Sequence, residues 1–266
     1  MRIVRFKQDD NVHFGLVEGD EVRVLTDDPL RGIRPGPVRL PLAGLRLLAP
    51  VDPPDVLAIG LNYRDHADET GAPYPNAPLV FLKAGAAVVG PEAPIRLPEM
   101  APDEVDYEAE LAIIIGRPCR QVREAEALSY VFGYTCGNDI SARDCQRRLD
   151  RQWARAKSFE TFCPLGPWIE TDFDPERADI GLRLNGQTMQ ASNTGNMLFS
   201  CRYLISYCSR IFTLRPGTVI LTGTPAGVGV ARRPPVFLRE GDTVEVTIAG
   251  IGTLRNPVER EPPWNP

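Results

Sequence analysis

The sequence is poor in the residues that build zinc sites. It has only two histidines, His13 and His66, and none of its six cysteines forms a Cys-x-x-Cys pair. A zinc site made of cysteine and histidine is therefore nearly excluded, and the thiols are best explained as free core residues of a reducing compartment. Cys163 is an alternative nucleophile, although no second histidine is left to pair with it if His66 has another role.

Long apolar runs are also missing. No stretch approaches the ~20 apolar residues of a membrane helix, and the N-terminus, MRIVRFKQDDN, becomes charged before an apolar run of useful length. Acidic residues outnumber basic ones by 35 to 30, and no segment concentrates lysine and arginine. We therefore expect a cytoplasmic protein without a membrane segment or a nucleic-acid partner, in which local groups must capture any anionic ligand.

Short strand patterns dominate the rest of the chain. Alternating apolar and polar residues predict a small β module at 1–50, and the cluster Pro50, Pro53 and Pro54 places a boundary before a catalytic domain at 51–266. The 26 prolines argue against a helical bundle or a regular βαβ repeat. The predicted class is α+β, rich in β-structure. Helices are expected at 124–130, 142–156 and 198–212.

Two glutamates stand at the mouth of a strongly apolar strand. Glu108 and Glu110 stand immediately before the run 111–115, which should be buried on both faces. On a strand such residues point to the same side, about 6–7 Å apart. Their repulsion needs a cation or a shared proton, and a hard divalent cation is the simplest compensator. The alternative is an exposed strand end with two solvated glutamates.

A third carboxylate, Asp139, follows another apolar stretch, residues 130–136. It stands at the end of a strand-like segment, where a carboxylate is held rigidly. Three carboxylates, completed by water and substrate oxygens, suit Mg²⁺ or Mn²⁺. Glu108, Glu110 and Asp139 are therefore the candidate metal ligands.

His66 and Glu69 are three residues apart in a segment that reads as a short helix, which Asn62 can cap and Gly71 can end. They share one helical face, and a carboxylate beside an imidazole raises its basicity, as a general base near neutral pH requires. The alternative is a solvent-facing polar pair. The other histidine, His13, is assigned a structural role.

The glycine-rich segment 223–229 does not carry a nucleotide motif. It lacks the Gly-Lys-Ser/Thr ending of a phosphate loop, and no Gly-x-Gly-x-x-Gly fingerprint follows a strand elsewhere. A tight turn that brings Thr224 and backbone amides toward a substrate carboxylate is the better interpretation. Trp153 is assigned to the core rather than to a substrate platform.

Taken in order, several motifs resemble the fumarylacetoacetate hydrolase family over roughly residues 50 to 258. The motifs are Gly60-Leu-Asn-Tyr-Arg-Asp-His66-x-x-Glu69, Phe81-Leu-Lys83, Asp106-Tyr-Glu108-x-Glu110, Asn138-Asp139-x-Ser-Ala-Arg143-Asp144-x-Gln146, Lys157-Ser-Phe, Pro164-Leu-Gly-Pro and Leu221-Thr-Gly-Thr224-Pro-x-Gly-Val-Gly229. Each motif is weak alone, and the ordered set is specific. One departure is that Ala84-Gly85-Ala86 follows Lys83, where the family often has proline and a small hydroxyl residue.

The resemblance implies a mixed β-sandwich roll, a homodimer, and Mg²⁺ or Mn²⁺ on the three carboxylates. It also implies that His66 with Glu69 activates water or shuttles a proton, and that Lys157 supports the reacting carbonyl. The positions matching substrate contacts in the family are Arg143, Gln146, Thr224 and, more weakly, Lys83.

Three functions follow from these residues and the resemblance. The leading hypothesis is a metal-dependent hydrolase that cleaves a carbon–carbon bond in an acylpyruvate of the fumarylpyruvate or acetylpyruvate type. The second is a decarboxylase, isomerase or tautomerase of a 2-oxo acid such as oxaloacetate or 2-hydroxyhepta-2,4-diene-1,7-dioate, since fold and metal site do not fix the reaction. The third is a metal-binding protein without turnover.

Overall fold

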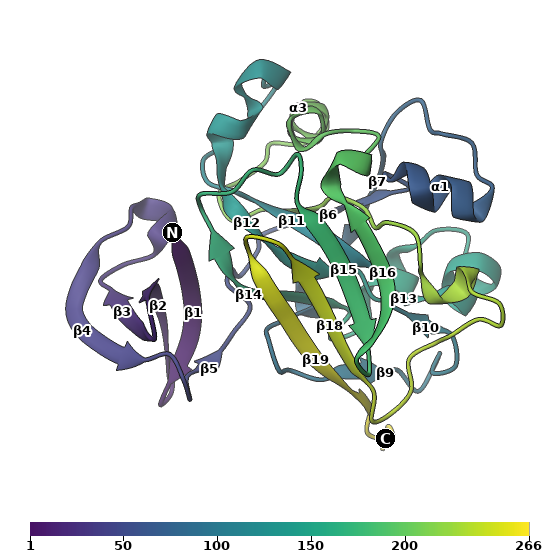
Figure 1. Cartoon of the computed structure of the whole chain (residues 1–266), viewed down its shortest axis with the longest axis horizontal. Coiled ribbons are helices and arrows are strands. Elements are labelled where there is room, and N and C mark those ends of the chain that lie inside the picture. Colours follow the sequence, from purple (N-terminus) through teal and green to yellow (C-terminus); the bar gives the residue numbers. More distant parts are fainter. Residues whose placement is uncertain (266) are drawn as a thin grey trace.

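The computed structural model describes residues 1–265, and a large mixed sheet is the main element of the fold (Figure 1). The sheet runs in the order β4-β3-β2-β1-β14-β12-β11-β17-β6-β7, with β5 beside β1 and β8 beside β14. Its strands are β1 (Arg2–Gln8), β2 (Asn11–Glu18), β3 (Glu21–Leu25), β4 (Pro35–Pro41), β5 (Arg46–Leu47), β6 (Val56–Gly60), β7 (Leu79–Lys83), β8 (Val88–Val89), β11 (Ala109–Ile115), β12 (Val131–Asn138), β14 (Cys163–Glu170) and β17 (Val219–Leu221).

A second sheet of five strands covers β11 and β12, in the order β16-β15-β18-β19-β9 (Figure 1). Every residue of β11 is buried, as its apolar run 111–115 predicts for a strand covered on both faces. The five strands are β9 (Ile95–Leu97), β15 (Asp179–Leu184), β16 (Gln187–Asn193), β18 (Thr243–Ile248) and β19 (Gly252–Arg260). A short pair, β10 (Val105–Asp106) with β13 (Ser141–Ala142), lies beside the candidate site.

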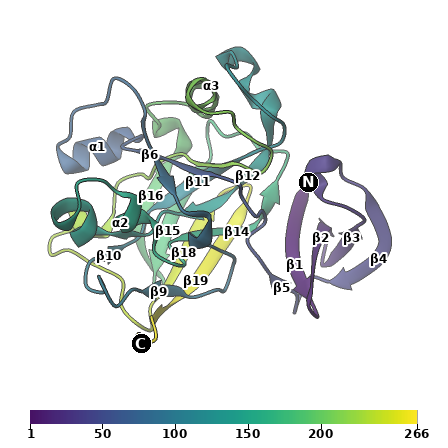
Figure 2. The same ribbon diagram turned by 180° about the vertical axis from the view of Figure 1, so that it is seen from behind.

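Strands β1 to β4 form a lobe at one end of the molecule, seen from both sides in Figures 1 and 2. Alternation along β1 sends Val4 and Phe6 into a small core with Val22, whereas Ile3 faces the main core. Strand β1 also pairs with β14, and the N-terminal amine donates to Glu170 Oε1 at 2.6 Å. The lobe thus extends the large sheet. The predicted domain boundary near residue 50 stays a prediction.

Helices are few and short. They are α1 (Arg64–Thr70), α2 (Ala154–Ser158), α3 (Cys201–Ile211), the 3₁₀ turns η1 (Pro29–Arg31), η2 (Gly85–Ala87), η3 (Glu124–Tyr130), η5 (Thr194–Asn196) and η6 (Gly229–Ala231), and the π-helical turn η4 (Cys145–Leu149). The helix expected at 198–212 is α3, which the Ser200 side chain caps by accepting from Tyr203 N. The segment 124–130 is 3₁₀ rather than α-helical.

The continuous helix expected at 142–156 is wrong. Ser141 and Ala142 pair with β10 instead, opposite Asp106 and Val105. The chain then makes a single π-helical turn and leaves the helical conformation at Asp150 (φ −114°, ψ 153°) before α2 begins. Strand pairing and the break at Asp150 therefore override the helical pattern of the sequence.

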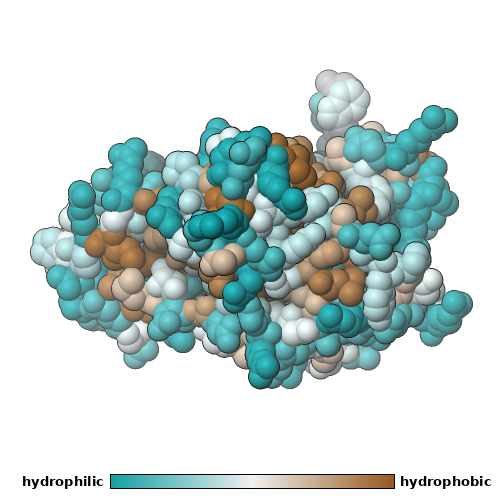
Figure 3. Space-filling view, turned by 90° about the horizontal axis from the view of Figure 1, so that it is seen from above, coloured by the Kyte–Doolittle hydropathy of each residue, from teal (hydrophilic) through white to brown (hydrophobic). Residues whose placement is uncertain are grey.

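The β-rich mixed fold predicted from the sequence is confirmed. Among the described residues, no helix is long and apolar enough to cross a membrane. Seen from above (Figure 3), apolar side chains form patches separated by polar ones. The apolar area of this face is therefore divided rather than continuous.

Candidate active site

Strands β11 and β12 bring the three predicted carboxylates together. The two strands pair antiparallel with Ala109 opposite Asn138, and Asp139 N donates to Glu108 O at 2.9 Å. One ligand atom from each of Glu108, Glu110 and Asp139 lies within 4.8 Å of the others. All three are buried, with 6%, 1% and 1% of their surface exposed. The alternative of an exposed strand end is therefore wrong.

Two buried lysines hold Asp139 in place. Lys157 Nζ, on α2, donates to Glu108 Oε2 at 2.7 Å and to Asp139 Oδ2 at 2.6 Å. Lys83 Nζ, at the end of β7, donates to Asp139 Oδ1 at 2.5 Å and to Ile140 O at 3.3 Å. Neither lysine exposes more than 3% of its side chain. Such pairs compensate buried charge and fix the carboxylates in position.

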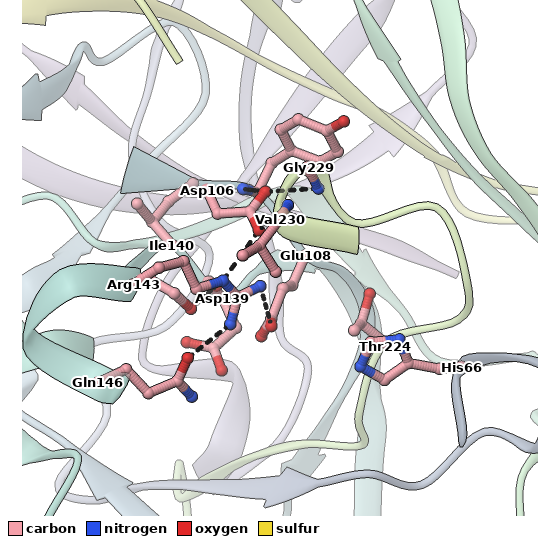
Figure 4. A network of polar contacts seen from close by, with 12 residues as sticks. His66, Asp106, Glu108, Asp139, Ile140, Arg143, Gln146, Thr224, Gly229 and Val230 are labelled. Atoms are coloured by element: carbon pink, nitrogen blue, oxygen red, sulfur yellow. Dashed lines mark hydrogen bonds and ion pairs between the residues drawn. The ribbon is translucent and has the colours of Figure 1, made fainter. Parts of the chain in front are cut away.

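Arg143 links the carboxylate cluster to a second buried acid, Asp106 (Figure 4). Its Nε donates to Asp106 Oδ2 at 2.8 Å, its Nη2 to Glu108 Oε1 at 2.7 Å, and its Nη1 to Gln146 Oε1 at 2.8 Å. Asp106 also accepts the backbone N–H groups of Gly229 and Val230. Asp106, a buried anchor, therefore ties the loop after β17 to the site.

The three carboxylates differ in their electrostatics. Burial raises the pKa of Glu108, but Lys157 and Arg143 outweigh it, so the net pKa is lowered and the group is anionic. The pKa of Glu110 is raised well above its usual range by burial and by the charges of Asp139 and Glu108. Among residues 1–265, Glu110 has no cationic side-chain partner and accepts only Gly223 N, at 2.7 Å. The cluster has one carboxylate that needs a further cation.

This donor set fits a hard divalent cation. All candidate ligands are carboxylate oxygens, the type that Mg²⁺ and Mn²⁺ prefer, and each oxygen keeps a lone pair beyond its hydrogen bond. Around the site, four buried carboxylates (Asp106, Glu108, Glu110, Asp139) face three buried cations (Lys83, Arg143, Lys157). With all four carboxylates ionised, a bound divalent cation would leave a net charge of one positive, which suits an anionic substrate.

The predicted pair of His66 and Glu69 forms on α1. His66 Nδ1 lies 3.3 Å from Glu69 Oε2, and Glu69 Oε1 accepts Gly227 N at 2.9 Å. Gly227 adopts φ +105°, and a Cβ there would lie 2.1 Å from Met189 O, so only glycine fits. Gly71 ends the helix in the left-handed conformation, as predicted. The loop 223–229 thus orients the acid of this pair.

The expected capping role of Asn62 is wrong. Tyr63 occupies the N-cap position, without a side-chain hydrogen bond. Asn62 is buried, donates to Phe199 O and Thr222 O, and accepts Phe199 N at 2.8 Å. It therefore joins the start of α1 to two distant segments.

Most of the predicted site residues line a cavity of about 360 Å³. His66 and Thr224 stand on one side of it, opposite Arg143 and Gln146 (Figure 4). Thr224 Oγ accepts from Gln190 Nε2 at 2.8 Å. The predicted residues that line the cavity are His66, Glu108, Glu110, Asp139, Arg143, Gln146, Lys157 and Thr224. Lys83 lies behind Asp139 and does not line it, so the structure offers no substrate contact for Lys83.

The sequence analysis missed part of the cavity wall. Trp153, assigned there to the core, lines the cavity and packs edge-on against Phe81 with ring centroids 5.3 Å apart. Arg147 also lines it, although no motif singled this residue out. Cys163 is buried in β14, and burial raises the pKa of its thiol to about 12. This disfavours the alternative of a cysteine nucleophile.

Lys83→Met is expected to destabilise the metal-free protein by about 3 kcal/mol, because Asp139 loses one of its two buried counter-ions. Urea unfolding followed by circular dichroism measures the change. The control, Arg255→Met, removes an exposed ion pair with Glu92 and should cost about 0–1 kcal/mol. Equally small losses in both variants would contradict the role of Lys83 as a buried counter-ion.

Comparison with known proteins identifies the family. The model for the fumarylacetoacetate hydrolase C-terminal domain matches residues 55–259, and the Rv2993c-like N-terminal model matches residues 1–50. Protein Rv2993c of Mycobacterium tuberculosis is 45% identical over 98% of this chain and 99% of its own length. The mitochondrial oxaloacetate tautomerase of Xenopus laevis is 46% identical over 81% of this chain and 69% of its own.

Solved structures agree. The crystal structure of 5-carboxymethyl-2-hydroxymuconate delta-isomerase from Mycobacterium smegmatis superposes with a TM-score of 0.89 at 46% identity, covering 98% of this chain and 100% of that one. That of 2-hydroxyhepta-2,4-diene-1,7-dioate isomerase from Mycobacterium marinum gives 0.88 at 43% identity, covering 99% and 100%. Because the family model spans more than half of the chain and these relatives align along most of it, the chain belongs to the fumarylacetoacetate hydrolase family.

Proposed function

We propose that this chain is a divalent-metal-dependent enzyme that moves the proton next to the 2-oxo group of a small 2-oxo diacid, as a tautomerase or isomerase. The observation that carries the proposal is the cavity itself: it is lined by His66 and by the cluster of Glu108, Glu110 and Asp139, and Glu69 lies behind His66, at 3.3 Å from its Nδ1. Support also comes from relatives named as an oxaloacetate tautomerase and as isomerases of unsaturated 2-hydroxy dioates.

The metal would be Mg²⁺ or Mn²⁺, held by Glu108, Glu110 and Asp139. When bound, such an ion would supply the Lewis acidity that polarises the 2-oxo acid and lowers the pKa of the C–H bond beside the 2-oxo group. Lys157 keeps two of the three ligands in position through its bonds to Glu108 and Asp139. Thr224 and Gln146 are proposed to orient the substrate from opposite walls.

His66 is the proposed base. If Nδ1 donates to Glu69, Nε2 is the basic nitrogen that faces the substrate. It takes the proton from C3, and Glu69, fixed by Gly227 N, compensates the positive charge that develops on the ring. Returning the proton to the 2-oxygen gives the enol, which is tautomerisation. Returning it to C5 of an unsaturated dioate shifts the double bond, which is isomerisation.

Hydrolysis is the second candidate. The observation in its favour is that Glu69 is fixed from two sides, by His66 and by Gly227 N, which suits a pair that must deprotonate water. In an acylpyruvate, that water would attack the distal carbonyl and break the carbon–carbon bond. The products would be the acid of the acyl group and pyruvate. The homodimer implied by the family and the cytoplasmic location expected from the sequence stay predictions. Light scattering that shows a monomer would contradict the homodimer.

One assay separates the candidates. The near-ultraviolet absorbance of oxaloacetate enol and of a panel of acylpyruvates is followed with and without Mg²⁺, while pyruvate is measured. We expect metal-dependent equilibration of oxaloacetate enol without stoichiometric pyruvate. Metal-dependent loss of the acylpyruvate absorbance with one pyruvate per substrate, and solvent oxygen in the new carboxylate, would instead establish the hydrolase. No metal-dependent change with any substrate would contradict both.

A further inference from the structure

Arg143, which the family resemblance places in contact with substrate, already binds other protein groups. Arg143 is buried, and each of its three guanidinium nitrogens donates to a protein group, namely Asp106, Glu108 and Gln146. Its charge balances two of the buried carboxylates rather than a ligand. A cation for a second substrate carboxylate must therefore come from elsewhere in the cavity wall.

Arg147, on the same turn η4, is placed to supply it. Its side chain lines the cavity and is exposed. Within residues 1–265 it makes no hydrogen bond and no ion pair. Its neighbour Arg148 behaves differently, because both of its terminal nitrogens bind Glu104, at 3.0 and 2.9 Å. Burial and the charge of Arg143 lower the pKa of Arg147, which agrees with a guanidinium that lacks its own acid.

A second hollow of about 390 Å³ adjoins the cavity at Arg147. The two spaces share Thr70 and Arg147, and the second is also lined by Arg232 and Arg233. Arg232 Nε is buried without a hydrogen-bond partner among the described residues. The acid that lines this hollow, Glu69, is already bonded to His66 and Gly227. Arg232 donates to Met189 O through Nη2 and keeps its charge without an acidic partner among the described residues. Three arginines and one carboxylate line this hollow, so the region around Arg147 attracts anions.

We propose that Arg147 binds the far carboxylate of the substrate and so selects 2-oxo diacids over 2-oxo monoacids. The inference rests on the proposed function, because it takes the three-carboxylate cluster as the end that holds the 2-oxo acid. With a divalent cation that end carries one positive charge, which one substrate carboxylate neutralises. A second carboxylate needs its own cation, and a guanidinium presents the bidentate donors that carboxylates match.

The test is binding to the Mg²⁺-loaded protein by calorimetry, with matched pairs of ligands. The pairs are oxaloacetate with 2-oxobutanoate, and 2-oxoglutarate with 2-oxopentanoate, which differ in carrying a carboxylate or a methyl group at the far end. Arg147→Gln should weaken diacid binding roughly tenfold, the scale of a partly shielded charge-assisted contact. Monoacid binding should stay within about twofold.

Arg148→Gln is the matched control, since it removes a cation from the same turn without touching the cavity, and it should change neither ligand class. Equal weakening of diacids and monoacids by Arg147→Gln, or no weakening of either, would overturn the inference. Turnover is measured separately. A wild type that prefers diacids but does not interconvert their tautomers contradicts the proposed reaction, while the ratio of the two binding constants still decides the role of Arg147.

Discussion

Glu110→Gln is expected to abolish metal-dependent turnover while leaving the protein folded. Glutamine keeps the shape of the side chain and removes one of three candidate ligand charges. The expected loss is roughly 4 kcal/mol of transition-state stabilisation, about a thousandfold in kcat. Calorimetry with Mg²⁺ should show a parallel loss of metal affinity. The ion pairs of Lys157 with Glu108 and Asp139 do not involve Glu110, so they should survive.

The metal-free stability of this variant gives an independent check. Burial and two neighbouring charges raise the pKa of Glu110 in the folded protein. Its ionisation therefore costs stability once the pH rises above its unfolded pKa, and the neutral glutamine avoids that cost. We expect Glu110→Gln without metal to be at least as stable as the wild type near neutral pH. Glu92→Gln, at an exposed position, is the control for the stability measurement. In the Mg²⁺ calorimetry, a wild-type affinity for Glu110→Gln would rule out Glu110 as a ligand.

His66→Ala is expected to lower kcat by about 10²–10⁴-fold, the usual contribution of a positioned general base. Because His66 is not among the candidate ligands, the affinity for Mg²⁺ should change little. Stopped-flow measurement of enol absorbance at saturating Mg²⁺ gives the rate. Glu69→Gln should have a smaller effect on kcat in the same direction, since it weakens the orientation and the charge compensation of the ring.

The chain offers a matched control in its only other histidine. His13 lies in β2, stacked against Phe6 with ring centroids 5.7 Å apart, in the N-terminal lobe. His13→Ala should leave kcat unchanged. If His66→Ala retained the wild-type rate, proton transfer by this histidine would be excluded for tautomerisation and for hydrolysis alike.

Sequence alone predicted the pair Glu108 and Glu110 because their arrangement is local: they are two residues apart and point to the same side. Asp139 was predicted from its place at the end of a strand-like segment and from the family resemblance, and the pairing of β11 with β12 places it beside them. The His66–Glu69 pair was also predictable, since three residues along a helix bring both to one face. In contrast, the prediction of a helix at 142–156 was wrong because Ser141 and Ala142 pair with β10, a strand distant in the sequence.

What the sequence by itself determined is therefore the set of chemical groups: three carboxylates, one basic histidine with its acid, and a β-rich chain of this family. Only the tertiary structure decided how their charges are balanced. Lys83 reaches Asp139 across 56 residues, and Gly227 reaches Glu69 across 158. It also showed that Arg143 pairs with buried acids, whereas Arg147 lines the cavity without an ion pair among the described residues. Such partners depend on which distant elements meet, and spacing along the chain does not encode that.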